Sequence, residues 1–312
     1  MKRYPVKLMP IAKTAIWGGR RLCEQYGICS DYESIAEAWV LTCREGNENL
    51  ISNGKACGMT LSEYLAAIGD NTSFADFPLL IKLIDARDKL SVQVHPSDAD
   101  AKALGMPYGK TEIWIVLDAE PGATIVWGMK EGVSANELEG SLRQGSLTEI
   151  LHTVPAKAGD VFYVPAGLLH AIGGGILLAE IQQSSDTTYR VWDYGRRDKD
   201  GNLRPLHTEE ALRVVRPISQ DEILREQFSR RVELPGRLLA AVPHFAVSEC
   251  KGSFTFIVQG DSFLSLLVTE GKGKLVSKEG ELSLSLGDSI YLPAGIGSVS
   301  ISGDLTCLLS RP

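Results

Sequence analysis

Residues 159–170 have the sequence GDVFYVPAGLLH, and residues 287–298 repeat it in degenerate form as GDSIYLPAGIGS. The two stretches share Gly, Asp, Tyr, Pro, Ala and Gly in the same register, which is six identities over nine positions. Self-similarity within one chain indicates related structural units, so the repeat predicts two units of the same architecture. The first copy ends in His170 and the second in Ser298. Any chemistry that needs this histidine is therefore expected in the first unit alone.

Short apolar and β-branched runs, broken by turn residues, surround both copies of the repeat. They predict strands within 78–96, 111–129 and 175–195, and again from 232 to the C-terminus. Many short strands with Gly-rich turns favour sandwiches, barrels or jelly rolls. The stretch EGKGKLVSKEGELSLSLGDSIYLPAG, a hairpin followed by a strand that ends in Pro-Ala-Gly, is typical of a cupin jelly roll. We therefore predict a mainly β protein with two cupin-like jelly-roll units, residues 1–230 and 231–312.

Helical patterns interrupt the strands in two places. Leucine and isoleucine recur at near-helical spacing within 134–154, and Ser134 precedes Glu137 by three residues, as in a capping box. These features predict a short helical insertion near 130–155. The segments 208–216 and 219–228 predict short helices that connect the two units.

Composition and charge exclude several classes of function. The net charge of −7 argues against a general nucleic-acid binder, although a local basic cluster can still bind an anionic small molecule. No apolar run approaches the ~18 residues of a membrane span, and the N-terminus lacks the apolar core of a secretory signal. The six cysteines form no CxxC pair and are interpreted as reduced thiols. We expect a cytoplasmic protein with no nucleic-acid or membrane partner.

Three stretches of the first unit carry candidate metal ligands. Gln93 and His95 are two residues apart in a predicted strand and therefore share a face. Glu112 opens the next strand, and His170 follows Pro165–Gly167 with the spacing G-x5-P-x-G-x2-H, which is the second metal-binding motif of cupins. Two imidazoles and one carboxylate suit zinc, and they leave room for water or substrate as a catalytic site needs.

Each of these residues also has a structural interpretation when taken alone. A His-Pro pair is common in turns, a glutamate that opens a strand is usually solvated, and a histidine after Pro-x-Gly can bond to the backbone. Their placement on successive strands of one unit favours the metal site. The other three histidines lack such partners, and we predict structural or surface roles for His152, His207 and His244.

Four stretches in one order, PLLIKLIDARDKLSVQVHP, GKTEIWIVL, VPAGLLHAIG and YRVWDYGR, resemble type I phosphomannose isomerases, most closely the short bacterial form. AIWGGRRL, ESIAEAWVLT and RPLH extend the resemblance over most of the chain. It implies a zinc-dependent isomerase, with one zinc per chain, that interconverts mannose 6-phosphate and fructose 6-phosphate through an enediol. The large helical domain of longer family members is missing here, so their lid arrangement is not carried over.

The resemblance also implies roles for individual residues. The family's zinc ligands fall on His95, Glu112, His170 and, as a weaker or absent ligand in the short form, Gln93. Its essential arginine falls on Arg190, its active-site lysine on Lys110 and a pocket position on Glu180. Since isomerisation needs a general base, and Glu180 lies on the strand beyond the metal histidine, we take Glu180 as the candidate base. Further pocket positions, which we expect to bind the substrate, fall on Lys82, Ser91 and Asp186.

Two other functions and several properties stay open on the sequence alone. The alternatives are an isomerase of another sugar or sugar phosphate, and a non-catalytic cupin that binds sugar. The partner is expected to be a small sugar phosphate, and monomer and homodimer are equally compatible with the sequence. The second unit shows no Q-x-H, since SFLSLLV occupies that region, so we predict that it binds no metal.

Overall fold

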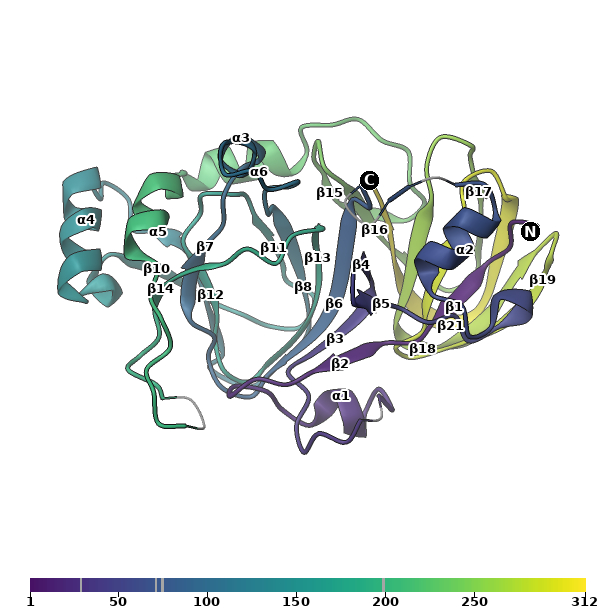
Figure 1. Cartoon of the computed structure of the whole chain (residues 1–312), viewed down its shortest axis with the longest axis horizontal. Coiled ribbons are helices and arrows are strands. Elements are labelled where there is room, and N and C mark those ends of the chain that lie inside the picture. The colour runs from purple at the N-terminus through teal and green to yellow at the C-terminus, as the bar shows by residue number, and fades with distance from the viewer. Residues whose placement is uncertain (29, 71, 74–75, 198–199) are drawn as a thin grey trace.

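The computed structural model describes residues 1–28, 30–70, 72–73, 76–197 and 200–312. Two of its sheets make up what we call the first unit, which lies to the left in Figure 1. In spatial order, the six-stranded sheet contains β11 (Val161–Val164), β8 (Glu112–Ala119), β13 (Ile176–Gln183), β6 (Leu79–Ala86), β3 (Glu37–Leu41) and β2 (Ile11–Lys13). The five-stranded sheet contains β10 (Leu151–Pro155), β9 (Thr124–Met129), β12 (His170–Ile172), β7 (Val92–Val94) and β14 (Tyr189–Trp192).

An eight-stranded antiparallel sheet makes up the second unit, to the right in Figure 1. Its main path is β1 (Val6–Leu8), β20 (Ser289–Leu292), β18 (Leu264–Ser277), β21 (Gly297–Arg311), β16 (Ala246–Lys251) and β15 (Arg237–Ala241). Two further strands pair with the ends of the long strands: β17 (Phe254–Val258) with the N-terminal end of β21, and β19 (Gly280–Ser285) with the C-terminal end of β18. A separate hairpin pairs β4 (Cys43–Arg44) with β5 (Asn47–Glu48). The predominance of strands confirms the mainly β prediction.

The N-terminal strand departs from the predicted division of the chain at residue 231. β1 pairs antiparallel with β20, so residues 6–8 lie in the sheet of the second unit. The larger hydrophobic cluster also contains buried residues from both units. The second unit is therefore completed by the opposite end of the chain, and 231–312 does not include all of its strands.

The helices lie at the edges of the two units. They are α1 (Arg21–Glu24), α2 (Leu61–Ala67), α3 (Asp98–Ala103), α4 (Ala135–Gln144), α5 (Thr208–Val214) and α6 (Gln220–Gln227), with short 3-10 turns η1 (Gly54–Ala56) and η2 (Leu147–Glu149). The expected capping box is present, since Ser134 and Glu137 bond reciprocally at the start of α4. The two connecting helices correspond to α5 and α6. The helical expectation was wrong for 151–154, which lie in β10 and pair with β9.

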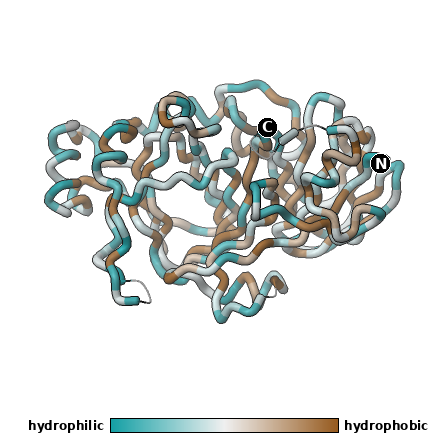
Figure 2. Tube along the Cα trace, in the orientation of Figure 1, coloured by the Kyte–Doolittle hydropathy of each residue, from teal (hydrophilic) through white to brown (hydrophobic). Residues whose placement is uncertain are grey.

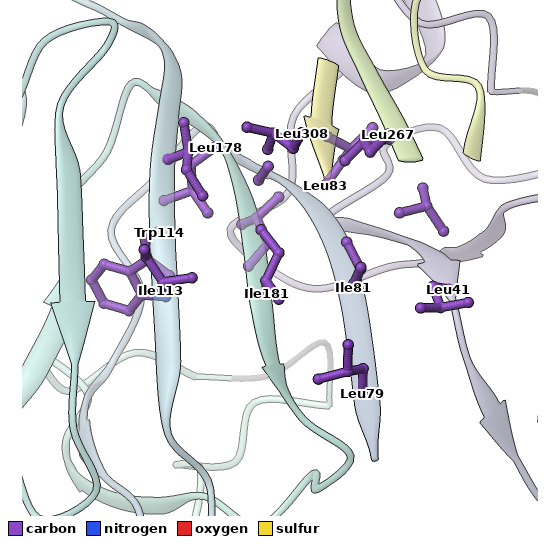
Figure 3. Packing of buried hydrophobic residues seen from close by; sticks show 14 of the residues in the cluster. Leu41, Leu79, Ile81, Leu83, Ile113, Trp114, Leu178, Ile181, Leu267 and Leu308 are labelled. Atoms are coloured by element: carbon purple, nitrogen blue, oxygen red, sulfur yellow. The ribbon is translucent and has the colours of Figure 1, made fainter. Parts of the chain in front are cut away.

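Every residue of β6 and β13 is buried, which indicates that the centre of the six-stranded sheet is covered on both faces. Ile113, Ile181 and Ile81 lie directly opposite one another on neighbouring strands and form an apolar row on one face. Figure 3 shows Leu267 and Leu308 of the second unit close to this part of the sheet, and all five belong to one hydrophobic cluster. The second unit covers this face, so polar residues of the sheet are concentrated on the other face.

The hydropathy of the residues differs between the interior and the periphery of the molecule. In Figure 2 the strands in the interior are mostly brown, and the peripheral helices and loops carry most of the teal segments. Among the described residues, no helix is both long and apolar enough to cross a membrane.

The two copies of the repeat adopt the same local structure. Gly159 and Gly287 have φ of 88° and 82°, and the glycines after the prolines, Gly167 and Gly295, have 89° and 78°. Only glycine adopts this left-handed region at little cost, so the shared glycines fix both turns. The intervening aspartates also match, because each carboxylate accepts a hydrogen bond from the backbone N–H three residues earlier, at 2.9 Å and 2.7 Å. The two copies of the repeat are therefore similar in local structure as well as in sequence.

Candidate metal centre and active site

Three short elements of the first unit bring His95, Glu112 and His170 together. Glu112 is the first residue of β8, His170 is the first residue of β12, and His95 follows β7 directly. The Pro-Ala-Gly turn holds them in place, because the Gly167 N–H donates to the His95 carbonyl at 2.9 Å and Val164 lies opposite Glu112. Each of the three side chains is only 1% exposed. Together they form what we call the triad.

The ligand atoms of the triad lie at distances that suit a shared metal ion. The His95 and His170 Nε2 atoms are 3.1 Å apart, and Glu112 lies 3.2 Å from His95 Nε2 and 3.9 Å from His170 Nε2. Ligands at 2.0–2.1 Å in a tetrahedral zinc site are separated by about 3.3 Å. His170 Nδ1 lies 2.8 Å from the Leu168 carbonyl. A carbonyl oxygen only accepts, so Nδ1 carries the proton and Nε2 is free to bind a metal.

The electrostatics of the triad favour the protonation states that bind metal ions. Burial and the neighbouring Lys110 ammonium lower the pKa of His95 to about 3, and burial also lowers the pKa of His170. Burial acts to raise the pKa of Glu112, but Lys110 and His95 outweigh it and hold that pKa well below its usual range. Two neutral imidazoles and one carboxylate are the forms in which these side chains bind a divalent ion.

Lys110 lies against the triad. Its Nζ is 2.7 Å from Glu112 and 3.2 Å from His95 Nε2, and the side chain is buried. The Lys110 backbone N–H donates to the Pro96 carbonyl at 3.0 Å, which ties the residue to the turn after His95. A fixed ammonium at this position can stabilise negative charge on a substrate oxygen or donate a proton to it.

Glu180 and Lys82 form a buried ion pair beside the triad. They lie opposite each other on β13 and β6, and Lys82 Nζ is 3.0 Å from Glu180 and 3.7 Å from Glu37. Burial and the negative charge of Glu112 raise the pKa of Glu180. Burial acts to lower the pKa of Lys82, but Glu180 and Glu37 outweigh it and raise that pKa. A lysine buried in an apolar strand needs an opposite charge nearby, and Glu180 provides it for Lys82.

Arg190 and Gln93 belong to the five-stranded sheet that carries His170. In register, Arg190 on β14 lies opposite Gln93 on β7, and Gln93 lies opposite His170 on β12. The Arg190 Nη1 donates to the Pro205 carbonyl at 3.0 Å, and its buried Nε has no hydrogen-bond partner among the described residues. Gln93 is half-buried beside the triad. Its role as a ligand stays a prediction.

The last two predicted site residues lie in different environments. Ser91 is buried and lies immediately before β7, two residues before Gln93. Asp186 lies in the segment after β13, and its side chain is 63% exposed and pairs with Arg44 at 2.9 Å. The structure therefore brings Lys110 into direct contact with the triad. Glu180 is linked to Glu112 through the Trp114 indole and pairs with Lys82, whereas Asp186 pairs with Arg44.

Comparison with known proteins identifies the family. Residues 6–112 match the catalytic domain of type I phosphomannose isomerase, and residues 238–312 match the cupin domain of mannose-6-phosphate isomerase. The chain is 35% identical to mannose-6-phosphate isomerase ManA of Bacillus subtilis, with all of both chains covered. The chain belongs to the type I phosphomannose isomerases. It is also 36% identical to the mannose-6-phosphate isomerase of Streptococcus mutans, with 98% of each chain covered.

A solved structure extends this finding to three dimensions. The crystal structure of the mannose 6-phosphate isomerase from Bacillus subtilis superposes with a TM-score of 0.85 at 32% identity, and it covers 98% of this chain and 99% of that one. The family, the enzyme class and the cupin fold that the sequence motifs indicated are thereby confirmed. The match spans the full length of the relative, so the phosphomannose isomerase architecture includes both units.

The remaining histidines lie apart from the triad in this family member. His152 Nδ1 lies 3.3 Å from the Trp127 carbonyl, and His244 pairs with Asp98 at 3.4 Å. His207 Nδ1 accepts a hydrogen bond from the Arg190 backbone N–H at 3.1 Å, so it supports a predicted site residue. Within the described ranges, the triad is the only group of His, Cys, Asp and Glu side chains close enough to hold a metal.

Sequence reasoning missed two side chains that complete the site. The indole N–H of Trp114 donates to Glu112 at 3.1 Å and to Glu180 at 3.0 Å. Glu37 approaches Lys82 and accepts a hydrogen bond from Trp39 at 2.7 Å. The period of two along a strand could have predicted Trp114, because a residue two positions after Glu112 lies on the same face of the strand. For Glu37 the sequence carried no comparable signal.

The repeat also identifies the positions of the second unit that correspond to the triad. The Gly295 N–H donates to the Gln259 carbonyl at 2.7 Å, as Gly167 does to His95, and Leu292 lies opposite Leu264, as Val164 does to Glu112. The triad therefore corresponds to Gln259, Leu264 and Ser298. The interpretation that SFLSLLV occupies the Q-x-H region was wrong, because this stretch corresponds to the glutamate strand.

We expect Ser298→His to create no second metal site in the phosphomannose isomerase chain. Two of the three corresponding positions would still hold a glutamine and a leucine, and an apolar side chain supplies no ligand. Metal analysis of the purified variant should give the same number of metal ions per chain as the wild type. A second equivalent of tightly bound metal would contradict the proposed correspondence.

Proposed function

We propose that the chain interconverts mannose 6-phosphate and fructose 6-phosphate, using one zinc ion per chain held by the triad. The observation that carries the proposal is the convergence of two buried imidazoles and a buried carboxylate next to Lys110, in a member of the phosphomannose isomerase family. A buried cluster of this kind costs free energy unless it is paired or binds a metal. A metal-dependent reaction accounts for it directly.

The donor set of the triad favours zinc over harder ions. Imidazole nitrogens suit zinc and other borderline transition metals, whereas magnesium and calcium prefer all-oxygen sites. Three protein ligands also leave a coordination position open, as catalytic zinc sites require. When bound, zinc would supply Lewis-acid polarisation of the sugar oxygens at C1 and C2. We propose the Gln93 amide oxygen as a weaker additional ligand.

The residues around the triad can perform the proton transfers of an aldose–ketose isomerisation. A proton must leave a carbon next to a carbonyl, and the resulting enediol carries negative charge on its oxygens. Glu180 is the proposed base for the carbon-bound proton, and the Lys82 ammonium at 3.0 Å orients its carboxylate. Lys110, at 2.7 Å from Glu112, is proposed to stabilise the charge or to move a proton at the oxygens.

We propose that Arg190 anchors the substrate on the side of the five-stranded sheet. Its guanidinium carries a permanent charge and a planar set of donors that suits phosphate, and its Nε has no described partner. Ser91 and Asp186 are the remaining proposed substrate contacts. Lys82 is already matched by Glu180 and Glu37, so its part in substrate binding acts through the orientation of Glu180.

The test is a coupled assay for fructose 6-phosphate formed from mannose 6-phosphate, before and after removal of metal with a chelator. We expect activity to fall by roughly 10³-fold or more, because loss of Lewis-acid stabilisation removes several kcal/mol. Addition of zinc should restore it. Full activity of the metal-free protein would contradict the metal mechanism, and metal binding without turnover would contradict the proposed reaction.

A further inference from the structure

Four residues that lie directly opposite one another form a row across the six-stranded sheet. Trp39 pairs with Lys82, Lys82 with Glu180, and Glu180 with Trp114. Residues directly opposite in an antiparallel pair point to the same face. Glu112 precedes Trp114 by two residues and shares that face. The row therefore lies on the same side of the sheet as the triad, and Trp114 is the member next to it.

The indole of Trp114 joins a metal ligand to the proposed base. Its Nε1 lies 3.1 Å from Glu112 Oε2 and 3.0 Å from Glu180 Oε1, so one N–H is shared between two carboxylates. The Trp114 ring also packs against His170 in a T-shaped arrangement, with ring centroids 5.3 Å apart and an interplanar angle of 75°. One side chain thus contacts two members of the triad and Glu180.

These contacts differ from those of a tryptophan that only fills a core. Trp114 is fully buried, and a buried indole needs one acceptor for its N–H. Here the donor faces two acidic groups, which would repel each other without a donor between them. The indole N–H cannot accept or lose a proton under ordinary conditions, so it fixes the carboxylates without exchanging protons with them.

We propose that Trp114 is a positioning residue that sets the orientation of both Glu112 and Glu180. By binding Glu112 Oε2 it directs Oε1 toward His95 and the metal position, where Oε1 lies 3.2 Å from His95 Nε2. By binding Glu180 Oε1 it leaves Oε2 for Lys82 at 3.0 Å. This role rests on the proposed function, in which Glu112 is a ligand and Glu180 a base.

The first test compares Trp114→Phe with Trp192→Phe in the full chain. Phenylalanine keeps an aromatic ring but removes the N–H. We expect Trp114→Phe to weaken zinc binding by about 10- to 100-fold, as loss of a group that orients a metal ligand does, and to lower kcat more than it raises KM. Zinc affinity is measured by competition with a chromogenic chelator. Trp192 packs on Tyr194, and its variant should keep wild-type zinc affinity.

A folded Trp114→Phe protein with wild-type zinc affinity and wild-type kcat would overturn the proposal. An equal loss of zinc affinity in Trp192→Phe would also overturn it, because the effect would then reflect general destabilisation. Zinc affinity is independent of turnover. A wild-type protein that binds zinc but does not isomerise mannose 6-phosphate would refute the proposed function, and the zinc affinities of Trp114→Phe and Trp192→Phe would still confirm or overturn the role of Trp114 in positioning Glu112.

A second measurement needs no variant at position 114 and covers the case in which Trp114→Phe does not fold. The chain has five tryptophans, so wild-type protein labelled with 15N-tryptophan should give five indole N–H signals. Replacing the other tryptophans one at a time assigns the signal of Trp114. We expect zinc to shift this signal more than that of Trp192. A Trp114 signal that does not move while zinc binds would contradict the proposal.

Discussion

His170→Ala is expected to abolish stoichiometric zinc binding and to lower kcat by roughly 10³-fold or more, since a zinc ion contributes several kcal/mol to the stabilisation of developing charge. His170 is the residue whose Nδ1 is held by the Leu168 carbonyl, so its Nε2 is oriented toward His95 before any metal binds. Alanine removes both the ligand and this preorganisation. Zinc content of the dialysed protein and the coupled assay measure the two effects.

His152→Ala is the matched control for this variant. His152 lies in β10 and is half-buried, and its contacts are with the Trp127 carbonyl and Gln220 rather than with the triad. We expect it to keep wild-type zinc content and turnover. A His170→Ala protein that is folded, retains stoichiometric zinc and turns over at the wild-type rate would contradict the assignment of His170 as a ligand.

Glu180→Gln is expected to lower kcat by about 10²- to 10⁴-fold, the usual contribution of a general base, while zinc content stays unchanged. Glutamine has nearly the same shape and can still accept the hydrogen bond from Trp114, so the variant removes the basic carboxylate and leaves the orientation of Glu112 intact. The measurements are steady-state kinetics with mannose 6-phosphate and zinc analysis of the same preparation.

Glu37→Gln separates loss of the base from loss of charge around Lys82. Glu37 is the second carboxylate near Lys82, at 3.7 Å, and it bonds to Trp39 rather than to Trp114. If Glu180 acts as the base, Glu37→Gln should have the smaller effect on kcat by at least about tenfold. Equal losses of kcat in the two variants would show that both act only by removing a negative charge that neutralises Lys82. That result would contradict the assignment of Glu180 as the base.

The parts of the fold that were predicted correctly depend on local signals. The repeated G-D-x-x-Y-x-P-A-G contains its own turn chemistry, and both copies adopt the same backbone conformation. The three triad residues could also be selected as candidate ligands from the sequence, because the period of two in a strand and the spacing from Pro165 to His170 are local features. Both the capping box at Ser134 and the two connecting helices follow from short-range patterns.

The parts that could not be predicted depend on contacts between distant segments. Nothing within residues 6–8 indicates that they pair with β20, in which Tyr291 lies opposite Val6. The row from Trp39 to Trp114 depends on the register of four strands, which one sequence does not reveal. Leu151 was assigned to a helix because its spacing from Leu147 is helical, but pairing with β9 places it in a strand. Tertiary context overrides local propensity in this case.

The central claim is that zinc binds in the first unit, between His95, Glu112 and His170, and nowhere in the second unit. Anomalous diffraction from a crystal of the purified protein, measured on both sides of the zinc absorption edge, tests it most directly. The account predicts one strong peak per chain, surrounded by the two Nε2 atoms and the Glu112 carboxylate. Absence of a peak from the triad of a zinc-loaded crystal, or a peak beside Gln259 and Ser298, would contradict it.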